Sequence, residues 1–255
     1  MSTSELWSTG TARERECTTK GAVDPVLINR VMRAVDRTLR CHHVDVSARV
    51  RLTGPACADA PTLAQAKVAF RNTHVRVQVP GPSGFIATFL ADRLDRQLAR
   101  LTSGALPRYW PDPARPPLAM PTDERPIVRR KHSALLTGTP DEAVRAMDAM
   151  DYDAYLYTDA ETGDDAVVYW AGPLGVRLAR QHQRQLPESA SALSLTVNPH
   201  PTRRLTEVEA VARLCRYGLP FLFFTDPSSR RGRLLYRRYD GALAIVLPAA
   251  QGGRS

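Results

Sequence analysis

Cationic side chains in the first hundred residues lie at spacings that suit phosphate binding. Residues 44–52 alternate strictly, with apolar side chains at even positions and polar ones at odd positions, as in a half-buried strand. Residues 64–71 and 74–79 alternate in the same way. One face of this sheet would be apolar, and the other would present Arg49, Arg51, Lys67, Arg71, His74 and Arg76. Such a surface releases counterions from phosphates, which predicts nucleic-acid binding that weakens with salt.

Basic stripes also mark the two helices predicted beside this sheet. The first helix begins at Asp24 and Pro25, an N-cap followed by proline at the first helical position, and the second spans about residues 84–101. From these helices and the preceding strand we predict further RNA contacts by Lys20, Arg30, Arg33, Arg37, Arg40, Arg93, Arg96 and Arg100. The predicted sheet face has no aromatic side chain for base stacking, so the expected contact is with RNA shape and backbone.

Composition supports this interpretation and leaves one alternative open. The chain of 255 residues has a net charge of +9, and only Lys20, Lys67 and Lys131 among its 35 basic residues are lysines. The planar guanidinium fork of arginine matches phosphate well. A skewed genomic base composition, which favours Arg and Ala, explains the arginine content equally well. An ordinary solvated surface is the alternative to RNA contact, and the arginine excess on the same stripes of three elements favours RNA contact.

No pattern typical of catalysis or metal binding is present. The histidines lack the spacing of a metal site, and no Walker, GxGxxG or Ser-His-Asp pattern occurs. Residues 159–165 resemble a calcium loop but lack the distal glutamate, so a hairpin turn is expected. The four cysteines have no CxxC spacing and indicate free thiols, and no apolar run approaches the roughly 18 residues of a membrane span. We expect a cytoplasmic binding protein without enzymatic activity, cofactor or small-molecule substrate.

The second half of the chain repeats itself at a constant offset of 67 residues. Residues 139–179 align with 206–246 without a gap, and seven positions are identical. Residues 139–180 carry nine acidic and three basic side chains, whereas residues 204–255 carry four acidic and nine basic ones. Duplication of a small unit is typical of a binding protein with repeated contact modules.

These patterns predict an α+β protein with three folded parts. The N-terminal part is a β-α-β-β-β-α sandwich with two helices on one face of its sheet, and each repeat has one helix with a three- to four-stranded sheet. Seven prolines at positions 107–126 indicate a semi-extended linker. The predicted boundaries are a flexible N-terminus at 1–15, an RNA-binding domain at 16–104, linkers at 105–125 and 181–192, and repeats at 126–180 and 193–250.

The repeats hold more apolar side chains than units of about 50 residues can bury alone. A private core in each repeat is the alternative to pairing between copies. As candidates for pairing, within one chain or in a homodimer, we select Tyr155, Tyr157, Tyr169, Phe221, Phe223 and Tyr236.

Several of these segments resemble a known family. Residues 221–226 (FLFFTD) and 235–241 (LYRRYDG) resemble the C-terminal domain of long-form ribosome hibernation promoting factors. The first repeat is similar to it through residues 127–131 (IVRRK), 139–144 (TPDEAV) and 157–163 (YTDAETG). The β-α-β-β-β-α order is similar to the ribosome-binding domain of that family.

The resemblance implies a function. The N-terminal domain would bind the small ribosomal subunit, with its rRNA and proteins, in the channel for mRNA and tRNA. It would thereby inhibit translation and stabilise inactive ribosomes in dormancy or stress. In that family the C-terminal domain homodimerises and joins two ribosomes, but this chain carries two copies of it. We therefore hypothesise that the acidic first copy pairs with the basic second copy and leaves single ribosomes. A nucleic-acid-binding regulator or adaptor acting on transcription, with the repeats as protein-docking modules, is the alternative.

Overall fold

The computed structural model describes residues 14–44, 46–55, 60–70, 73–104, 107, 125–172, 175–182, 193–238 and 241–249. The described contacts divide the chain into an N-terminal unit, Met1–Ala105 with Ala149–Asp151, and a C-terminal unit made of the remainder. Both predicted repeats therefore fall in one unit. Arg71, predicted on the sheet face, lies outside the described residues.

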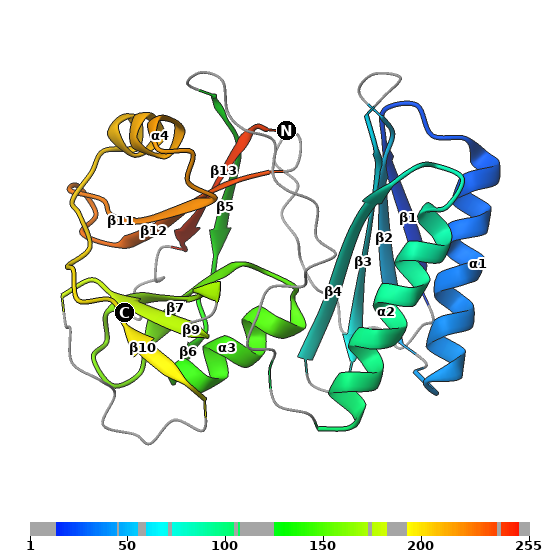
Figure 1. Cartoon of the computed structure of the whole chain (residues 1–255), viewed down its shortest axis with the longest axis horizontal. Coiled ribbons are helices and arrows are strands. Elements are labelled where there is room, and N and C mark those ends of the chain that lie inside the picture. Colours follow the sequence, from blue (N-terminus) through cyan, green and yellow to red (C-terminus); the bar gives the residue numbers. More distant parts are fainter. Residues whose placement is uncertain are drawn as a thin grey trace, which may run out of the picture. The chain divides into compact units, whose positions relative to one another are not determined.

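The N-terminal unit has the predicted order of elements. It runs β1 (Arg15–Lys20), α1 (Pro25–Cys41), β2 (Ala48–Thr53), β3 (Thr62–Phe70), β4 (Thr73–Gly81) and α2 (Ile86–Thr102). The sheet order is β1-β2-β3-β4, with β1 parallel to β2 and the other pairs antiparallel. Both helices cover the same face of this sheet (Figure 1).

Local sequence explains these elements. The Asp24 carboxylate accepts a hydrogen bond from the Val26 amide at 2.8 Å, so it caps α1 beside Pro25. In β2 the side chains at 48, 50 and 52 are buried, and those at 49 and 51 are exposed. Strand alternation thus directs one set of side chains into the core under the helices and the other set to the opposite face.

The first sheet of the C-terminal unit is formed mainly by the acidic repeat. Its elements are β6 (Thr137–Gly138), α3 (Pro140–Ala149), β7 (Ala154–Asp159), β8 (Asp165–Trp170), β9 (Val176–Arg180) and β10 (Leu195–Val197). The strand order is β10-β9-β8-β7-β6. The expected hairpin turn joins β7 to β8, where the Gly163 amide donates to the Asp159 carbonyl at 2.7 Å.

The second sheet is formed mainly by the basic repeat. Its elements are β5 (Ile127–Ser133), α4 (Glu207–Arg216), β11 (Phe221–Thr225), β12 (Gly232–Arg237) and β13 (Leu243–Pro248), and the strand order is β11-β12-β13-β5. Thr206 caps α4 in the predicted capping box with Glu209. Thr139 and Glu142 make the same reciprocal contacts at the start of α3. The two helices therefore begin by the same local mechanism.

Each repeat gives its first strand to the sheet of the other. β5 precedes the acidic repeat but pairs in parallel with β13, and β10 precedes the basic repeat but pairs in parallel with β9. The two strands occupy equivalent positions, because Val128 and Leu195 are separated by the repeat offset of 67. The sequence did not predict this reciprocal exchange. The fifth strand of the first sheet is β6, which pairs with β7, whereas the equivalent Arg204 forms only an isolated bridge with Thr225.

Strand exchange should make the two repeats unfold together. Ile245 in β13 is fully buried in the second sheet, and Ile245→Ala should destabilise that core by about 2–5 kcal/mol. Because β5 and β10 link the sheets, amide hydrogen exchange should accelerate in β8 as well as in β12. Leu94→Ala in the N-terminal unit is the control and should leave both strands protected. If amide exchange accelerated in β12 but stayed at the wild-type rate in β8, the two repeats would not unfold together.

Candidate nucleic-acid interface and repeat seam

Three cationic side chains lie directly opposite one another on the exposed face of the N-terminal sheet. In the strand register Arg49 of β2 pairs with Lys67 of β3, and Lys67 pairs with Arg76 of β4. We call Arg49, Lys67 and Arg76 the cationic row. Like charges at directly opposed strand positions repel each other, so an anion bound over this row would relieve that repulsion.

Polar groups surround the cationic row. The next row along the strands contains Arg51, Gln65 and Gln78, which oppose one another in the same register. The Arg76 guanidinium donates to the Gln65 side-chain oxygen at 3.3 Å and also to Gln78, which fixes its direction. At the β1 end, Glu16 forms an exposed ion pair with Arg49 at 3.0 Å. Such exposed pairs contribute little free energy and exchange readily for another anion.

His74 lies at the end of the same face, opposite Ala69 in the strand register. Partial burial and the neighbouring Lys67 ammonium lower the pKa of the His74 imidazole below its ordinary value of 6.5. The ring is therefore mainly neutral at pH 7, and a nearby phosphate would favour its protonated form.

The predicted RNA contacts divide between two surfaces. Arg49, Arg51, Lys67, His74 and Arg76 lie on the sheet face, and Lys20 is exposed at the end of β1. The helical layer covers the opposite face and carries the exposed side chains of Arg30, Arg33, Arg37, Arg40 and Arg96, with Arg100 partly exposed. A flat nucleic-acid surface could not contact both sets together, whereas a groove with two walls could.

The prediction that Arg93 faces outward is wrong. Arg93 is only 5% exposed and is one of the buried residues of α2. The helical period explains this, because Arg93 follows Leu90 by three residues and precedes Gln97 by four, and both are buried. Arg93 is therefore not placed as a surface contact.

The two repeats meet at an apolar cluster that we call the seam. Leu156, Val167 and Leu234 are each at most 4% exposed and form its centre. The side chains packed around them are Leu135, Ala154, Tyr169, Phe221, Phe223 and Val246. Each repeat thus contributes one face of its sheet to the cluster.

Three of the predicted pairing residues belong to the seam, and three lie elsewhere. Tyr169 and Phe221 make an edge-to-face contact with ring centroids 5.3 Å apart, and Phe223 packs beside them. Tyr157 is fully buried in the core of the first repeat, and Tyr155 packs against that core. The Tyr236 ring lies under the Lys131 ammonium at 5.1 Å.

The error at Tyr155 and Tyr157 has a simple cause. At the repeat offset these residues are equivalent to Leu222 and Phe224, which face the core of the second repeat. Adjacent strand residues point to opposite faces, so only Leu156 between them can reach the seam. Tyr155 and Tyr157 are therefore wrong as seam residues.

A buried carboxylate lies beside the seam, since Asp165 and Phe223 both pack against Gly232, and we call this place the polar end of the seam. Asp165 of β8 has a side chain 1% exposed and accepts from Arg231 Nε at 2.8 Å and Arg231 Nη2 at 3.0 Å. It also accepts from the backbone amide of Gly232 at 2.7 Å. These three donors come from the other repeat, and together they compensate the burial of the charge. The hydrogen bond to the Asp165 carboxylate is the main cause that raises the pKa of the Arg231 guanidinium above its ordinary value, and it outweighs the lowering by burial.

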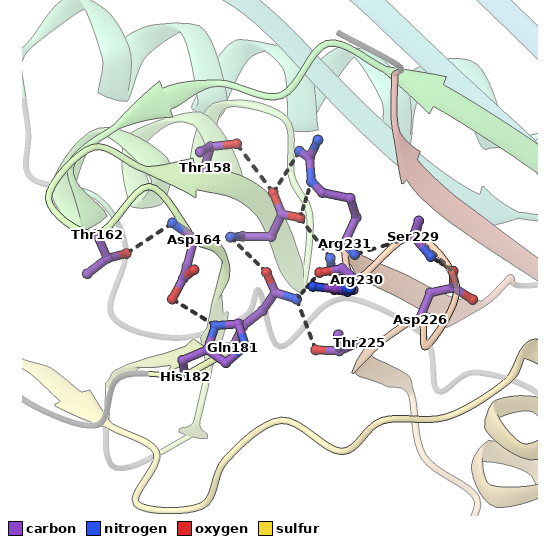
Figure 2. Close-up of polar contacts among 12 residues, drawn as sticks. Thr158, Thr162, Asp164, Gln181, His182, Thr225, Asp226, Ser229, Arg230 and Arg231 are labelled. Carbon is purple, nitrogen blue, oxygen red and sulfur yellow. Dashed lines mark hydrogen bonds and ion pairs between the residues drawn. The ribbon is translucent and has the colours of Figure 1, made fainter.

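Gln181 completes this polar end. Its side-chain oxygen accepts from the Asp165 amide at 3.1 Å, and its side-chain nitrogen donates to the Thr225 hydroxyl at 3.0 Å and the Arg230 carbonyl at 3.1 Å. Figure 2 shows Gln181 between the turn of the second repeat and the start of β8. Sequence reasoning missed Asp165, Gln181 and Arg231. The available signal was the opposite charge of the two repeats.

Among the residues that the structure describes, no three His, Cys, Asp or Glu side chains are grouped to hold a metal ion. The acidic loop between β7 and β8 instead supports an ion pair, because Asp159 accepts from the Arg180 guanidinium at 2.7 Å with both side chains fully buried. Within the described ranges no helix is both long and apolar enough to span a membrane.

Comparisons with known proteins cover both units. Residues 122–178 match the family described as Sigma 54 modulation/S30EA ribosomal protein C terminus. Proteins named dormancy associated translation inhibitor, from two strains of Mycobacterium tuberculosis, are each 47% identical over 230 residues. That alignment covers 88% of this chain and 84% of each relative.

Two solved structures are also similar to part of the chain. The Thermus thermophilus Protein Y N-terminal domain is 18% identical with a TM-score of 0.29, and the match covers 34% of this chain and 94% of that one. A ribosomal subunit interface protein from Coxiella burnetii is 15% identical with a TM-score of 0.31, and the match covers 35% of this chain and 98% of that one.

Protonation of His74 should strengthen RNA binding. The pKa of this imidazole is lowered, so acidification from pH 7 to about 5.5 adds positive charge beside the cationic row. Affinity for a structured RNA, measured by fluorescence anisotropy, should rise on acidification, and His74→Gln should reduce the rise. His132→Gln in the C-terminal unit is the control. An unchanged pH profile in His74→Gln would exclude this role.

Proposed function

Since the chain belongs to the family of ribosome hibernation promoting factors, the ribosome-associated translation inhibitors, we propose that it binds ribosomes and inhibits translation in dormant cells. Its N-terminal unit would occupy the channel for mRNA and tRNA on the small subunit. Occupancy alone blocks that channel, so the inhibition requires no catalytic group.

The cationic row is the observation that carries this proposal. Arg49, Lys67 and Arg76 hold three positive charges in register across three strands, and rRNA phosphates would neutralise their mutual repulsion. Gln65 and Arg51 beside the row add donors that suit phosphate and ribose oxygens. A rigid sheet presents these groups at fixed spacing, which favours recognition of RNA shape over base sequence.

A ribosomal groove would also explain the basic helical layer. Arg33, Arg37 and Arg40 are exposed on α1, on the surface opposite to the cationic row. An RNA-walled cleft can contact both surfaces of a domain inserted into it. The sheet face would make the closer contact, because its charges lie in register on a rigid element.

We further propose that the C-terminal unit keeps hibernating ribosomes single. The apolar seam and the contacts of Asp165 support pairing between the two copies within one chain. The surface that could recruit the same surface of another molecule is then occupied. Linking the copies in one chain also gives each a high effective concentration for the other.

Neutralising the sheet face should release the protein from ribosomes. Arg49→Gln, Arg51→Gln and Arg76→Gln together should weaken co-sedimentation and inhibit cell-free translation less, because phosphate contacts are lost. The slope of log affinity against log salt should shrink by about one for each lost contact.

The matched control removes the same charge from the helical layer. Arg33→Gln, Arg37→Gln and Arg40→Gln together should reduce inhibition less than the sheet-face variant does. Equal effects of the two variants would refute the primary role of the sheet, and full inhibition by the sheet-face variant would refute the proposed binding mode.

Ribosomes saturated with the protein should sediment as single particles. If the copies pair within one chain, raising the protein concentration should not increase the fraction of ribosome dimers in a sucrose gradient. A dominant dimer peak would refute internal pairing, while leaving ribosome binding by the N-terminal unit intact.

A further inference from the structure

The apolar part of the seam is nearly symmetric between the copies. Leu156 and Phe223 are equivalent at the repeat offset, and so are Val167 and Leu234; all four belong to the seam. A surface built from equivalent positions is complementary to itself, as in a two-fold symmetric dimer. By its apolar groups alone, either copy could therefore pair with another copy of its own kind.

The polar end of the seam breaks this symmetry. Asp164 and Asp165 of the first copy are equivalent to Arg231 and Gly232 of the second. Asp165 contacts both of these residues, including its own equivalent, Gly232. The pseudo-two-fold axis therefore passes beside Asp165, and the two sides of the axis carry different chemistry.

We propose that the contact of Asp165 with Arg231 and Gly232 makes pairing selective for unlike copies. This inference deepens the proposed pairing within one chain, on which it depends. The apolar face of the first copy therefore pairs with the face of a second copy, which carries Arg231 and Gly232. Pairing of two like copies is unfavourable because of a steric clash, like charges or lost hydrogen bonds.

Two first copies would collide at the axis. A Cβ atom added at Gly232 would lie 2.6 Å from the Asp165 Cβ, and a pair of first copies places an aspartate at both positions. A second aspartate at this place would also bring two buried carboxylates together without the Arg231 guanidinium. Buried like charges are strongly unfavourable, so this pairing is excluded.

Two second copies would lack an acceptor. Gly232 is buried and donates its amide to Asp165, and a copy with glycine at the equivalent position offers no carboxylate. The buried amide would remain unsatisfied, and the Arg231 side chains would lie near each other. Gln181 adds to the selection, because its equivalent Pro248 has no side-chain donor for Thr225 or the Arg230 carbonyl.

Selective pairing of unlike copies limits how two ribosome-bound chains can be joined. Two ribosome-bound chains could be joined by pairing of like copies, and both combinations are disfavoured. Pairing of unlike copies is satisfied inside each chain. The polar end of the seam thereby stops the duplicated surface from joining two molecules.

A first pair of full-length variants tests the contact. Arg231→Asp with Gly232→Asp gives the second copy the residues of the first. Amide exchange in β8 and β12 should accelerate on the order of a hundredfold, because the buried carboxylate loses its partner. Arg230→Asp is the control, since it repeats the Arg231→Asp charge change at the adjacent, exposed residue and should change exchange little.

A second variant exchanges the identities of the copies at three pairs of equivalent positions. Its substitutions are Leu156→Phe, Asp164→Arg, Asp165→Gly, Phe223→Leu, Arg231→Asp and Gly232→Asp. Composition and net charge are unchanged, and the unlike pair is restored in reversed orientation. Protection of β8 and β12 should return to within about tenfold of wild type, which a merely local role of each residue would not produce.

A milder variant keeps the test decisive if the first one fails to fold. Asp165→Asn preserves shape and removes the charge, and it should accelerate exchange of both strands by about tenfold. Two results would overturn the proposed selectivity: amide hydrogen exchange at the wild-type rate in Asp165→Asn, or no recovery of protection in the six-substitution variant. Co-sedimentation of each variant with ribosomes is measured in parallel. Failure of the wild type to co-sediment would refute the proposed function without changing the exchange results.

Discussion

Side chains of a strand alternate between two faces, and this constraint determines both candidate sites. In the N-terminal sheet, Val50 is buried under the helices, so Arg49 and Arg51 must lie on the opposite face. In the C-terminal unit, Leu156 belongs to the seam, so Tyr157 must lie in the private core. A cationic surface and an apolar pairing surface thus arise from the same period of two, with different residue types at the outward positions.

The N-terminal fold was predictable because its information is local. Strand alternation, the Asp24 cap and the apolar stripe of α1 each occupy short stretches of sequence, and the structure contains the elements they predict. Most side chains predicted on the sheet face are there for the same reason. Arg93 shows the limit of this reasoning, because a charged residue beside an apolar helical stripe can lie inside or outside, and only packing decides.

The arrangement of the repeats was less predictable because it depends on contacts far apart in sequence. β5 pairs with β13 more than a hundred residues later, and its alternation gives no sign of that partner. Asp165 and Arg231 are charged residues, of types usually exposed, at the start of β8 and just before β12, and only the packing of the two repeats brings them together. Comparing the copies position by position would have revealed the substitution of Asp-Asp by Arg-Gly, whereas net charge alone showed only the sign of the attraction.

Reciprocal strand exchange also changes the kinetic order of assembly. When two separate chains exchange strands, formation of the pair depends on the square of their concentration, and dilution dissociates it. Here both sheets are completed by one covalent chain, so assembly is a first-order process. A cell that makes few molecules of this protein, and then stops synthesis altogether, would retain the complete C-terminal unit on every one of them.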